Sequence, residues 1–301
     1  MKKKLLKLIR KILGTKECLN LPFFHYENQR FRMIEHIMHD SSEGITKEKY
    51  AEHNIIVSLT SYGKRIHDVA FTIESIMQQS MKANRIVLWL DYSFKGKQLP
   101  VSLTKLQNRG LEIMYCDDIR SFKKLIPSLK KFPNDAIITI DDDLIYEYDL
   151  IERLVRAHQE NPNIIHACRT RRMKFKNGKP LSYSTWKLCQ TEGVHKHNFL
   201  TSGGGTLFPP HCFDEEVLNE QVFMDICKFA DDVWLTAMAL KNGTPINKIC
   251  TRNPWGNEYL VNTNVQDIGL FNINGKNGGQ NDEQIKAVFN KYNLSTLFEE
   301  A

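Results

Sequence analysis

Several features that would assign the chain to a simple class are missing from its 301 residues. No stretch approaches the ~20 consecutive apolar residues that a membrane-spanning helix needs, and there are no internal repeats or low-complexity tracts. The seven cysteines are scattered and include no CxxC pair, which argues against a zinc site or a disulfide framework and favours a reducing compartment. What remains is the composition of an ordinary globular protein.

Net positive charge is also missing from the body of the chain. The total net charge is +6, but residues 1–16 hold seven Lys and Arg and no acid, so residues 17–301 together carry −1. A nucleic-acid-binding surface needs a basic patch or domain, so we do not expect nucleic acid as a partner.

The basic N-terminal segment, MKKKLLKLIRKIL, has the periodicity of an amphipathic helix. Its Leu and Ile residues fall within an arc of roughly 160°, and most of its Lys and Arg residues fall opposite. A cationic face beside an apolar face suits an anionic membrane surface, so we expect residues 2–13 to contact the inner face of the plasma membrane and the protein to be cytoplasmic and peripheral. A terminal helix that packs on its own domain is the alternative.

From about residue 54, continuous apolar runs alternate with amphipathic ones. The expected strands are residues 54–60, 85–90, 111–116, 136–140 and 163–168. The expected helices are residues 66–80, 100–108, 121–132, 148–160 and 231–243. Strands that are apolar on both faces indicate a mostly parallel sheet covered by helices on both sides, which is an α/β, Rossmann-like sandwich.

No linker-like composition divides this alternating region. We therefore expect one catalytic domain over residues 51–301, preceded by the amphipathic helix of residues 1–16. Residues 17–50 give weak signals and are expected to form short helices that connect the two.

Three consecutive aspartates, Asp141, Asp142 and Asp143, directly follow the apolar run 136–140. In a parallel α/β sheet, ligands bind beyond the carboxyl ends of the strands. Carboxylate oxygens are hard ligands that select Mg²⁺ or Mn²⁺, and such ions bridge protein carboxylates to substrate phosphates. If strand geometry continues, Asp141 and Asp143 point to one side and Asp142 away. An acidic first helical turn or a solvated loop is the alternative.

Two further segments contain residues suited to a site. The glycines of SGGGTLFPP, which begins at Ser202, allow close backbone approach and positive φ angles. No Lys-Ser/Thr pair follows them, so this is not a phosphate-binding P-loop. Asp231 and Asp232 begin a helix-like run, where they are suited either to capping the helix or to accepting a proton from an attacking hydroxyl group.

Five segments together resemble bacterial GT-A-type, family-2-like glycosyltransferases of capsule and lipopolysaccharide synthesis. They are IIVSLTSYGKRI, TIESIMQQSMKANRIVLWL, RSFKKLIPSLKKFPNDAIITIDDDLIY, SGGGTLFPP and ADDVWLTAMALKNG. The resemblance covers about residues 54 to 290 and implies a GT-A sandwich. It implies metal-dependent transfer of a sugar from a nucleotide-sugar donor, of which a UDP-sugar is the first expectation, to a hydroxyl of a surface-glycan acceptor.

The resemblance also implies roles for individual residues. It assigns Asp143 to a Mn²⁺ or Mg²⁺ ion, Asp141 to the metal or the ribose, and Asp142 to the nucleotide site beside them. The other residues that it places at the nucleotide are Thr60, Ser61, Tyr62, Arg65 and Lys124.

For the sugar-transfer step, the resemblance places Gly203 and Gly204 beside the donor sugar. It makes Asp232 the general base and Asp231 a contact to acceptor or donor. Inversion by one displacement is expected, because no second nucleophile is evident, and a lipid-linked acceptor would agree with the basic N-terminal segment. The alternatives are a metal-dependent nucleotidyltransferase or phosphohydrolase, and a catalytically inactive scaffold at the membrane surface.

Overall fold

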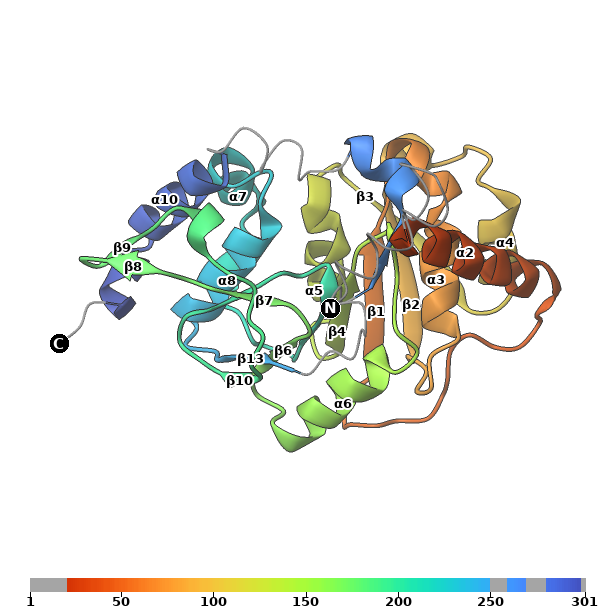
Figure 1. Ribbon diagram of the computed structural model, residues 1–301, viewed down its shortest axis with the longest axis horizontal. Helices are drawn as coiled ribbons and strands as arrows, with labels where there is room; N and C mark the ends of the chain where they lie inside the picture. Colours follow the sequence, from red (N-terminus) through yellow and green to blue (C-terminus); the bar gives the residue numbers. More distant parts are fainter. Residues whose placement is uncertain (1–20, 250–258, 269–279, 299–301) are drawn as a thin grey trace, which may run out of the picture.

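An eight-stranded sheet forms the centre of the computed structural model, which describes residues 21–249, 259–268 and 280–298 (Figure 1). The strand order is β10-β13-β6-β12-β4-β1-β2-β3. The strands are β1 (Ile55–Thr60), β2 (Arg85–Asp91), β3 (Leu111–Cys116), β4 (Ala136–Ile140), β6 (Ile165–Ala167), β10 (Gly193–Val194), β12 (Gly204–Phe208) and β13 (Ile246–Lys248). Only β10 and β12 run against the common direction. The prediction of a mostly parallel sheet is confirmed.

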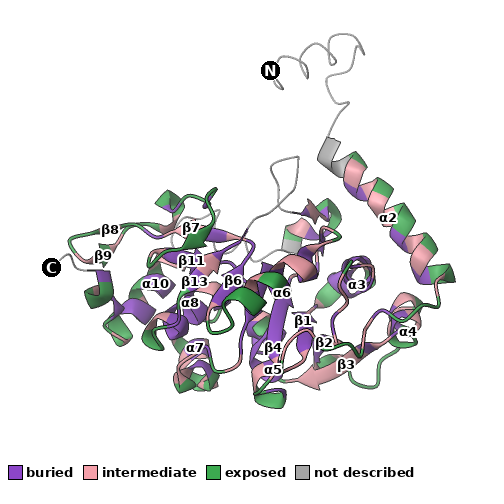
Figure 2. Cartoon of the chain, turned by 90° about the horizontal axis from the view of Figure 1, so that it is seen from below, coloured by how far each residue is buried: buried purple, intermediate pink, exposed green. Residues whose placement is uncertain are grey.

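Helices cover both faces of this sheet, and the sheet divides the apolar core in two (Figure 2). One face carries α2 (Leu21–His39), α3 (Val69–Met77), α4 (Val101–Gln107) and α6 (Leu150–Glu160), and the other carries α5 (Ile126–Lys131), α7 (Glu220–Ile226), α8 (Asp231–Lys241) and α10 (Gln280–Lys291). Side chains alternate between the faces of a strand. In β1, Val57 and Leu59 therefore enter the first core, and Ile56 enters the second. The predicted two-sided sandwich is confirmed.

Small two-stranded ribbons flank the central sheet. The ribbon of β5 (Leu144–Ile145) and β14 (Leu260–Val261) follows the three aspartates. The others pair β7 (Thr170–Arg172) with β11 (Asn198–Leu200) and β8 (Phe175–Lys176) with β9 (Lys179–Pro180).

The segment before the sheet differs from the expectation of short helices. Residues 21–39 form one continuous helix, α2, of 19 residues. Tyr26, Met33 and Ile37 lie on one face of it and are buried in the first core, so packing against the sheet domain stabilises a helix whose local sequence pattern is weak.

The helix expected over residues 121–132 is also different, because it is broken in two. A 3₁₀ turn covers Arg120–Lys124, and α5 starts only at Ile126. Pro127 has no backbone N–H and its ring excludes the carbonyl four residues earlier, so one continuous helix cannot form. The break frees the carbonyl of Lys124 to accept a 2.6 Å hydrogen bond from Ser58 Oγ of β1.

Among the described residues, no helix is long and apolar enough to cross a bilayer. Cys116, Cys168, Cys189, Cys212 and Cys227 are free thiols. The amphipathic segment of residues 1–16, on which the membrane prediction depends, lies outside the described residues.

Candidate active site

Four chain segments meet at the carboxyl edge of the sheet. β1 ends at Thr60 and β4 ends at Ile140, so residues 61–65 and the three aspartates emerge at the same edge. β12 is antiparallel and its first residue, Gly204, pairs with Ile140, so Ser202 and Gly203 arrive there as well. The fourth segment is the start of α8, whose Asp231 and Asp232 both bind Ser202.

Arg65 holds two of the three aspartates. Its Nη1 lies 2.7 Å from Asp142 Oδ1 and 3.1 Å from Asp143 Oδ2. Ser61 Oγ donates to Asp142 Oδ2 at 2.6 Å, and the Asp142 side chain is only 6% exposed. The expectation that Asp142 points away from Asp143 is therefore wrong, because β4 ends at Ile140 and strand alternation stops with it.

Asp143 has two further partners that the sequence did not reveal. Gln266 Nε2 donates to its carboxylate at 2.7 Å, and the backbone N–H of Asn262 donates to its carbonyl at 2.8 Å. Both residues lie more than 100 positions after Asp143 in the chain, beside β14. No motif in the sequence around Asn262 or Gln266 pointed to them.

Lys124 connects the third aspartate to the pair on α8. Its Nζ lies 2.6 Å from Asp141 Oδ1 and 3.2 Å from Asp231 Oδ2. Burial opposes the charge of this side chain, but the two carboxylates raise the pKa of Lys124 and keep it cationic. Burial also acts to raise the pKa of Asp141, and the Lys124 ammonium lowers it below its usual value.

Asp231 and Asp232 do not cap helix α8. The N-cap position is Ala230, and its side chain makes no capping hydrogen bond. Ser121 Oγ donates to Asp231 Oδ1 at 2.8 Å, while Ser202 donates to Asp232 Oδ1 from Oγ at 2.6 Å and from its backbone N–H at 2.7 Å. The capping alternative is wrong, because the two carboxylates bind Ser121, Ser202 and Lys124 instead.

Negative charge exceeds positive charge in this cluster. Among the described residues, five carboxylates face the two cations that bind them directly, Arg65 and Lys124, and the charge of Arg169 acts on Asp141 as well. Burial raises the pKa of Asp142 to about 6, because the opposing effect of Arg65 is partly offset by Asp143. Burial and the neighbouring Asp231 raise the pKa of Asp232 to about 7. Hard oxygen ligands with uncompensated negative charge fit a divalent cation, and Asp141, with 42% of its side chain exposed, is open to one.

The glycine loop lies directly against Asp141. A Cβ atom on Gly203 would stand 1.7 Å from Asp141 Oδ2, so only glycine fits there. Tyr146 fixes the same contact, since its hydroxyl accepts from the Asp141 N–H at 2.8 Å and donates to the Gly203 carbonyl at 2.5 Å. The positive φ angle of this loop occurs at Gly205 (+89°), where β12 has a bulge.

The remaining predicted nucleotide residues lie at the same edge but are less directly connected. Thr60 Oγ1 donates to the Trp89 carbonyl at 2.8 Å, which fixes this hydroxyl between β1 and β2. The Tyr62 ring lies 5.5 Å from the guanidinium carbon of Arg65. Gly204 packs against Arg169, and a Cβ there would stand 2.6 Å from the Arg169 Cβ.

We predict that Gly203 and Asp141 are energetically coupled. Gly203→Ala alone forces Asp141 away from Lys124 and should lower the free energy of unfolding by about 1–3 kcal/mol, as for other overpacked positions. In Gly203→Ala/Asp141→Ala the colliding carboxylate is gone. Urea unfolding of the two single variants and the double variant should show a coupling of at least about 1 kcal/mol. Additive effects would contradict the geometry.

Comparisons with known proteins assign this chain to no family. No family model matches and no curated protein matches. Among solved structures, the chain is similar to GalNAc-T7 with UDP, GalNAc and Mn²⁺ (TM-score 0.42, 12% identity, 65% of this chain and 41% of that one). It is also similar to a CMP:2-keto-3-deoxy-manno-octonic acid synthetase with CTP (TM-score 0.37, 11% identity, 66% and 89%). Likenesses this remote identify neither a family nor an activity.

Proposed function

We propose that the protein is a metal-dependent glycosyltransferase with a GT-A-type site. It would move a sugar from a nucleotide-sugar donor, with a UDP-sugar as the first candidate, to a hydroxyl of a cell-surface glycan, with inversion. One observation carries this proposal: Lys124 lies between the aspartates that follow β4 and the aspartate pair that begins α8. A phosphate-binding half and a proton-accepting half would then share one wall of the site.

In the phosphate-binding half, Asp141 and Asp143 would hold Mn²⁺ or Mg²⁺. The bound ion would supply positive charge to the diphosphate leaving group. Arg65 and Ser61 hold Asp142, which keeps the turn of Asp141–Asp143 in place without requiring Asp142 as a ligand. Lys124 is positioned to share its charge with the phosphate oxygens when they arrive.

In the other half, Asp232 would accept the proton of the acceptor hydroxyl as that oxygen attacks the anomeric carbon. Both bonds from Ser202 reach the same oxygen, Oδ1, and so fix the orientation of the carboxylate. A pKa of about 7 suits a general base, which must be deprotonated and still basic at neutral pH. Asp231 remains bound to Lys124 and Ser121 and would orient this half of the site.

The rival reaction is nucleotidyl transfer or hydrolysis at phosphorus, which would use the same aspartates. The aspartate pair on α8 favours sugar transfer, because attack at an anomeric carbon by a hydroxyl requires a base away from the phosphates. Products separate the reactions. Nucleoside diphosphate released from a nucleotide sugar indicates sugar transfer, whereas nucleoside monophosphate and sugar phosphate indicate hydrolysis at phosphorus. Pyrophosphate released from a nucleoside triphosphate that is supplied with a sugar or sugar phosphate indicates nucleotidyl transfer. An inactive scaffold would release none of these products.

The main prediction about activity concerns Asp232. Labelled UDP-sugars and GDP-sugars are incubated with protein, Mn²⁺ and glycan acceptors, and nucleoside diphosphate is measured. Asp232→Asn should lower kcat by about 100-fold or more while changing the donor KM little. The kcat/KM of the wild type should fall as the pH drops below about 7, because protonated Asp232 cannot accept a proton.

The matched control is Asp225→Asn, an aspartate of α7 outside the cluster, which should retain wild-type rates. Release of nucleoside monophosphate and sugar phosphate in place of nucleoside diphosphate would contradict the proposal, and so would release of pyrophosphate in a parallel assay with UTP or GTP and a sugar phosphate. Full activity of Asp232→Asn with a flat profile from pH 5.5 to 8 would also contradict it.

We also propose that the protein acts as a peripheral protein at the cytoplasmic face of the membrane. Phe24, Phe31 and Met38 recur every seven residues on α2 and are 58%, 64% and 48% exposed, on the side opposite Tyr26 and Met33. This apolar stripe begins eight residues after the basic segment of residues 1–16. An anionic lipid surface would meet the charge of that segment and the apolar side chains together.

Deleting residues 2–13 should reduce binding to vesicles of phosphatidylcholine and phosphatidylglycerol at least tenfold, because each Lys or Arg contributes roughly 1 kcal/mol near an anionic surface. Vesicle co-sedimentation measures this, and vesicles of pure phosphatidylcholine are the control. Phe31→Ser should weaken binding further without affecting the fold. Equal binding by the deletion variant would rule out this attachment.

A further inference from the structure

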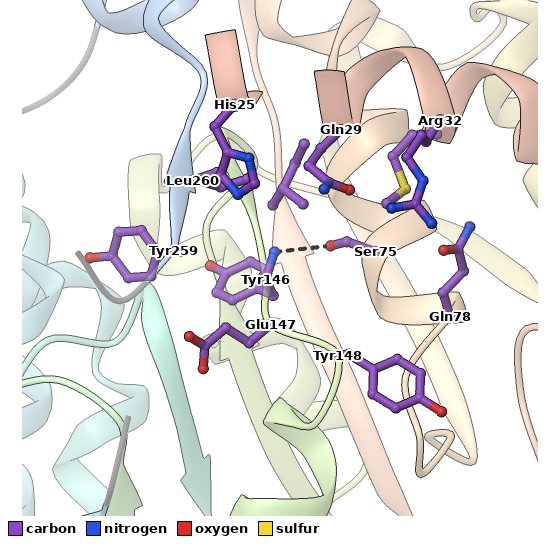
Figure 3. Close-up of a pocket in the computed structure, with 12 residues that line it drawn as sticks. His25, Gln29, Arg32, Ser75, Gln78, Tyr146, Glu147, Tyr148, Tyr259 and Leu260 are labelled. Carbon is purple, nitrogen blue, oxygen red and sulfur yellow. Dashed lines mark hydrogen bonds between the residues drawn. The ribbon is translucent and has the colours of Figure 1, made fainter. Parts of the chain in front are cut away.

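A cavity of about 340 Å³ lies under helix α2, next to the candidate active site (Figure 3). Its walls come from α2, from the C-terminal turn of α3 and from the residues that follow β5, and Leu260 of β14 closes one side. Its volume falls within the range of small-molecule sites, about 300–1,000 Å³. The aspartates of the active site do not line it, so it is a separate site.

The cavity combines an apolar inner wall with a polar rim. Met33, Ile145 and Tyr146 are buried and line the inner wall. Gln29 and Arg32 point into the cavity from α2, and Gln78 faces them from α3 (Figure 3). A purely apolar ligand would strip water from these side chains without replacing its hydrogen bonds, which is costly.

Charge at the cavity favours an uncharged ligand. In the described part of the chain, the lining residues include one arginine, Arg32, and one carboxylate, that of Glu147, which Arg153 binds at 2.8 Å. The single cation of Arg32 is few for a phosphate, which is usually bound by several cations, and the paired carboxylate of Glu147 is not suited to holding a metal ion. A molecule with many hydroxyl groups and an apolar ring face satisfies both the amides and the tyrosine rings, because tyrosine presents an apolar face and a polar tip.

Two tyrosines connect the cavity to the active site. Tyr146 lines the cavity with its ring, and its hydroxyl binds both Asp141 and Gly203 on the other side. Tyr259 also lines the cavity and packs edge-on against Tyr146 with ring centroids 6.0 Å apart. Its hydroxyl binds Arg169, against which Gly204 packs. One layer of side chains therefore separates the cavity from the sugar-binding edge of the site.

We propose that this cavity is a carbohydrate subsite that holds a neutral sugar unit of the acceptor glycan, remote from the hydroxyl that reacts. The proposal rests on the proposed sugar transfer. It gives α2 a role in acceptor choice, because Gln29 and Arg32 of this helix form one rim of the subsite. It also explains why Tyr148 stays 68% exposed at the mouth of the cavity, where its ring is available to a second sugar unit.

The test fills the cavity. Gln29→Trp places a large ring in it, and Asn28→Trp adds the same ring to the exposed side of α2 as a matched control. Saturation-transfer NMR is run on the full chain with a panel of methyl glycosides of neutral hexoses, N-acetylhexosamines and their disaccharides. We expect the wild type and Asn28→Trp to bind at least one disaccharide, and Gln29→Trp to bind it at least tenfold more weakly. Circular dichroism confirms folding.

A second assay separates this proposal from the proposed function. Hydrolysis of nucleotide sugars without acceptor should be the same in all three proteins, since the cavity lies away from the aspartates. Absence of glycoside binding, or equal binding by Gln29→Trp, overturns the subsite while sugar transfer stands. If glycosides bind and Gln29→Trp weakens them, but no nucleotide sugar is turned over, the cavity binds sugar for another purpose and the acceptor role is overturned.

Discussion

One buried ammonium group, that of Lys124, organises the candidate site. Its contacts with Asp141 and Asp231 hold together two segments that are about 90 residues apart in sequence. Breaking a buried ion pair from one side leaves an uncompensated charge, at a cost of about 3–5 kcal/mol. The positions of the aspartate turn, the glycine loop and the start of α8 therefore depend on this contact, and so does the spacing between the phosphate-binding and proton-accepting halves that we propose.

The fold around Lys124 supplies the geometry that this contact needs. Pro127 breaks the helix just after Lys124, and Ser58 of β1 holds the freed carbonyl. Gly203 lets the backbone approach Asp141 at a distance that no side chain would permit. The result is a cluster with more carboxylates than cations, because Arg65 and Lys124 neutralise only part of its negative charge.

Local sequence predicted the features that depend on local patterns. The parallel strands follow from their apolar runs, and the aspartates lie at the carboxyl end of β4 as expected from the strand that precedes them. Local sequence did not predict long-range partners: nothing near Gln266 or Asn262 indicates a contact with Asp143. It also did not predict the 19-residue helix α2, because the sequence pattern of this helix is weak and tertiary packing stabilises it. The side-chain directions of Asp142 and Asp143 were mispredicted because they depend on a turn, which sequence alternation does not describe.

The central claim is that a divalent cation and a nucleoside diphosphate bind together at the negatively charged cluster around Asp141 and Asp143. Isothermal titration calorimetry of UDP and GDP, each with Mn²⁺ and with EDTA, tests this claim most directly on the wild type and on Asp143→Asn. The account predicts that Mn²⁺ strengthens binding of one nucleotide at least tenfold in the wild type, which is about 1.4 kcal/mol, and that Asp143→Asn abolishes this gain. Nucleotide binding that is equally tight in EDTA, or a gain that survives in Asp143→Asn, would contradict it.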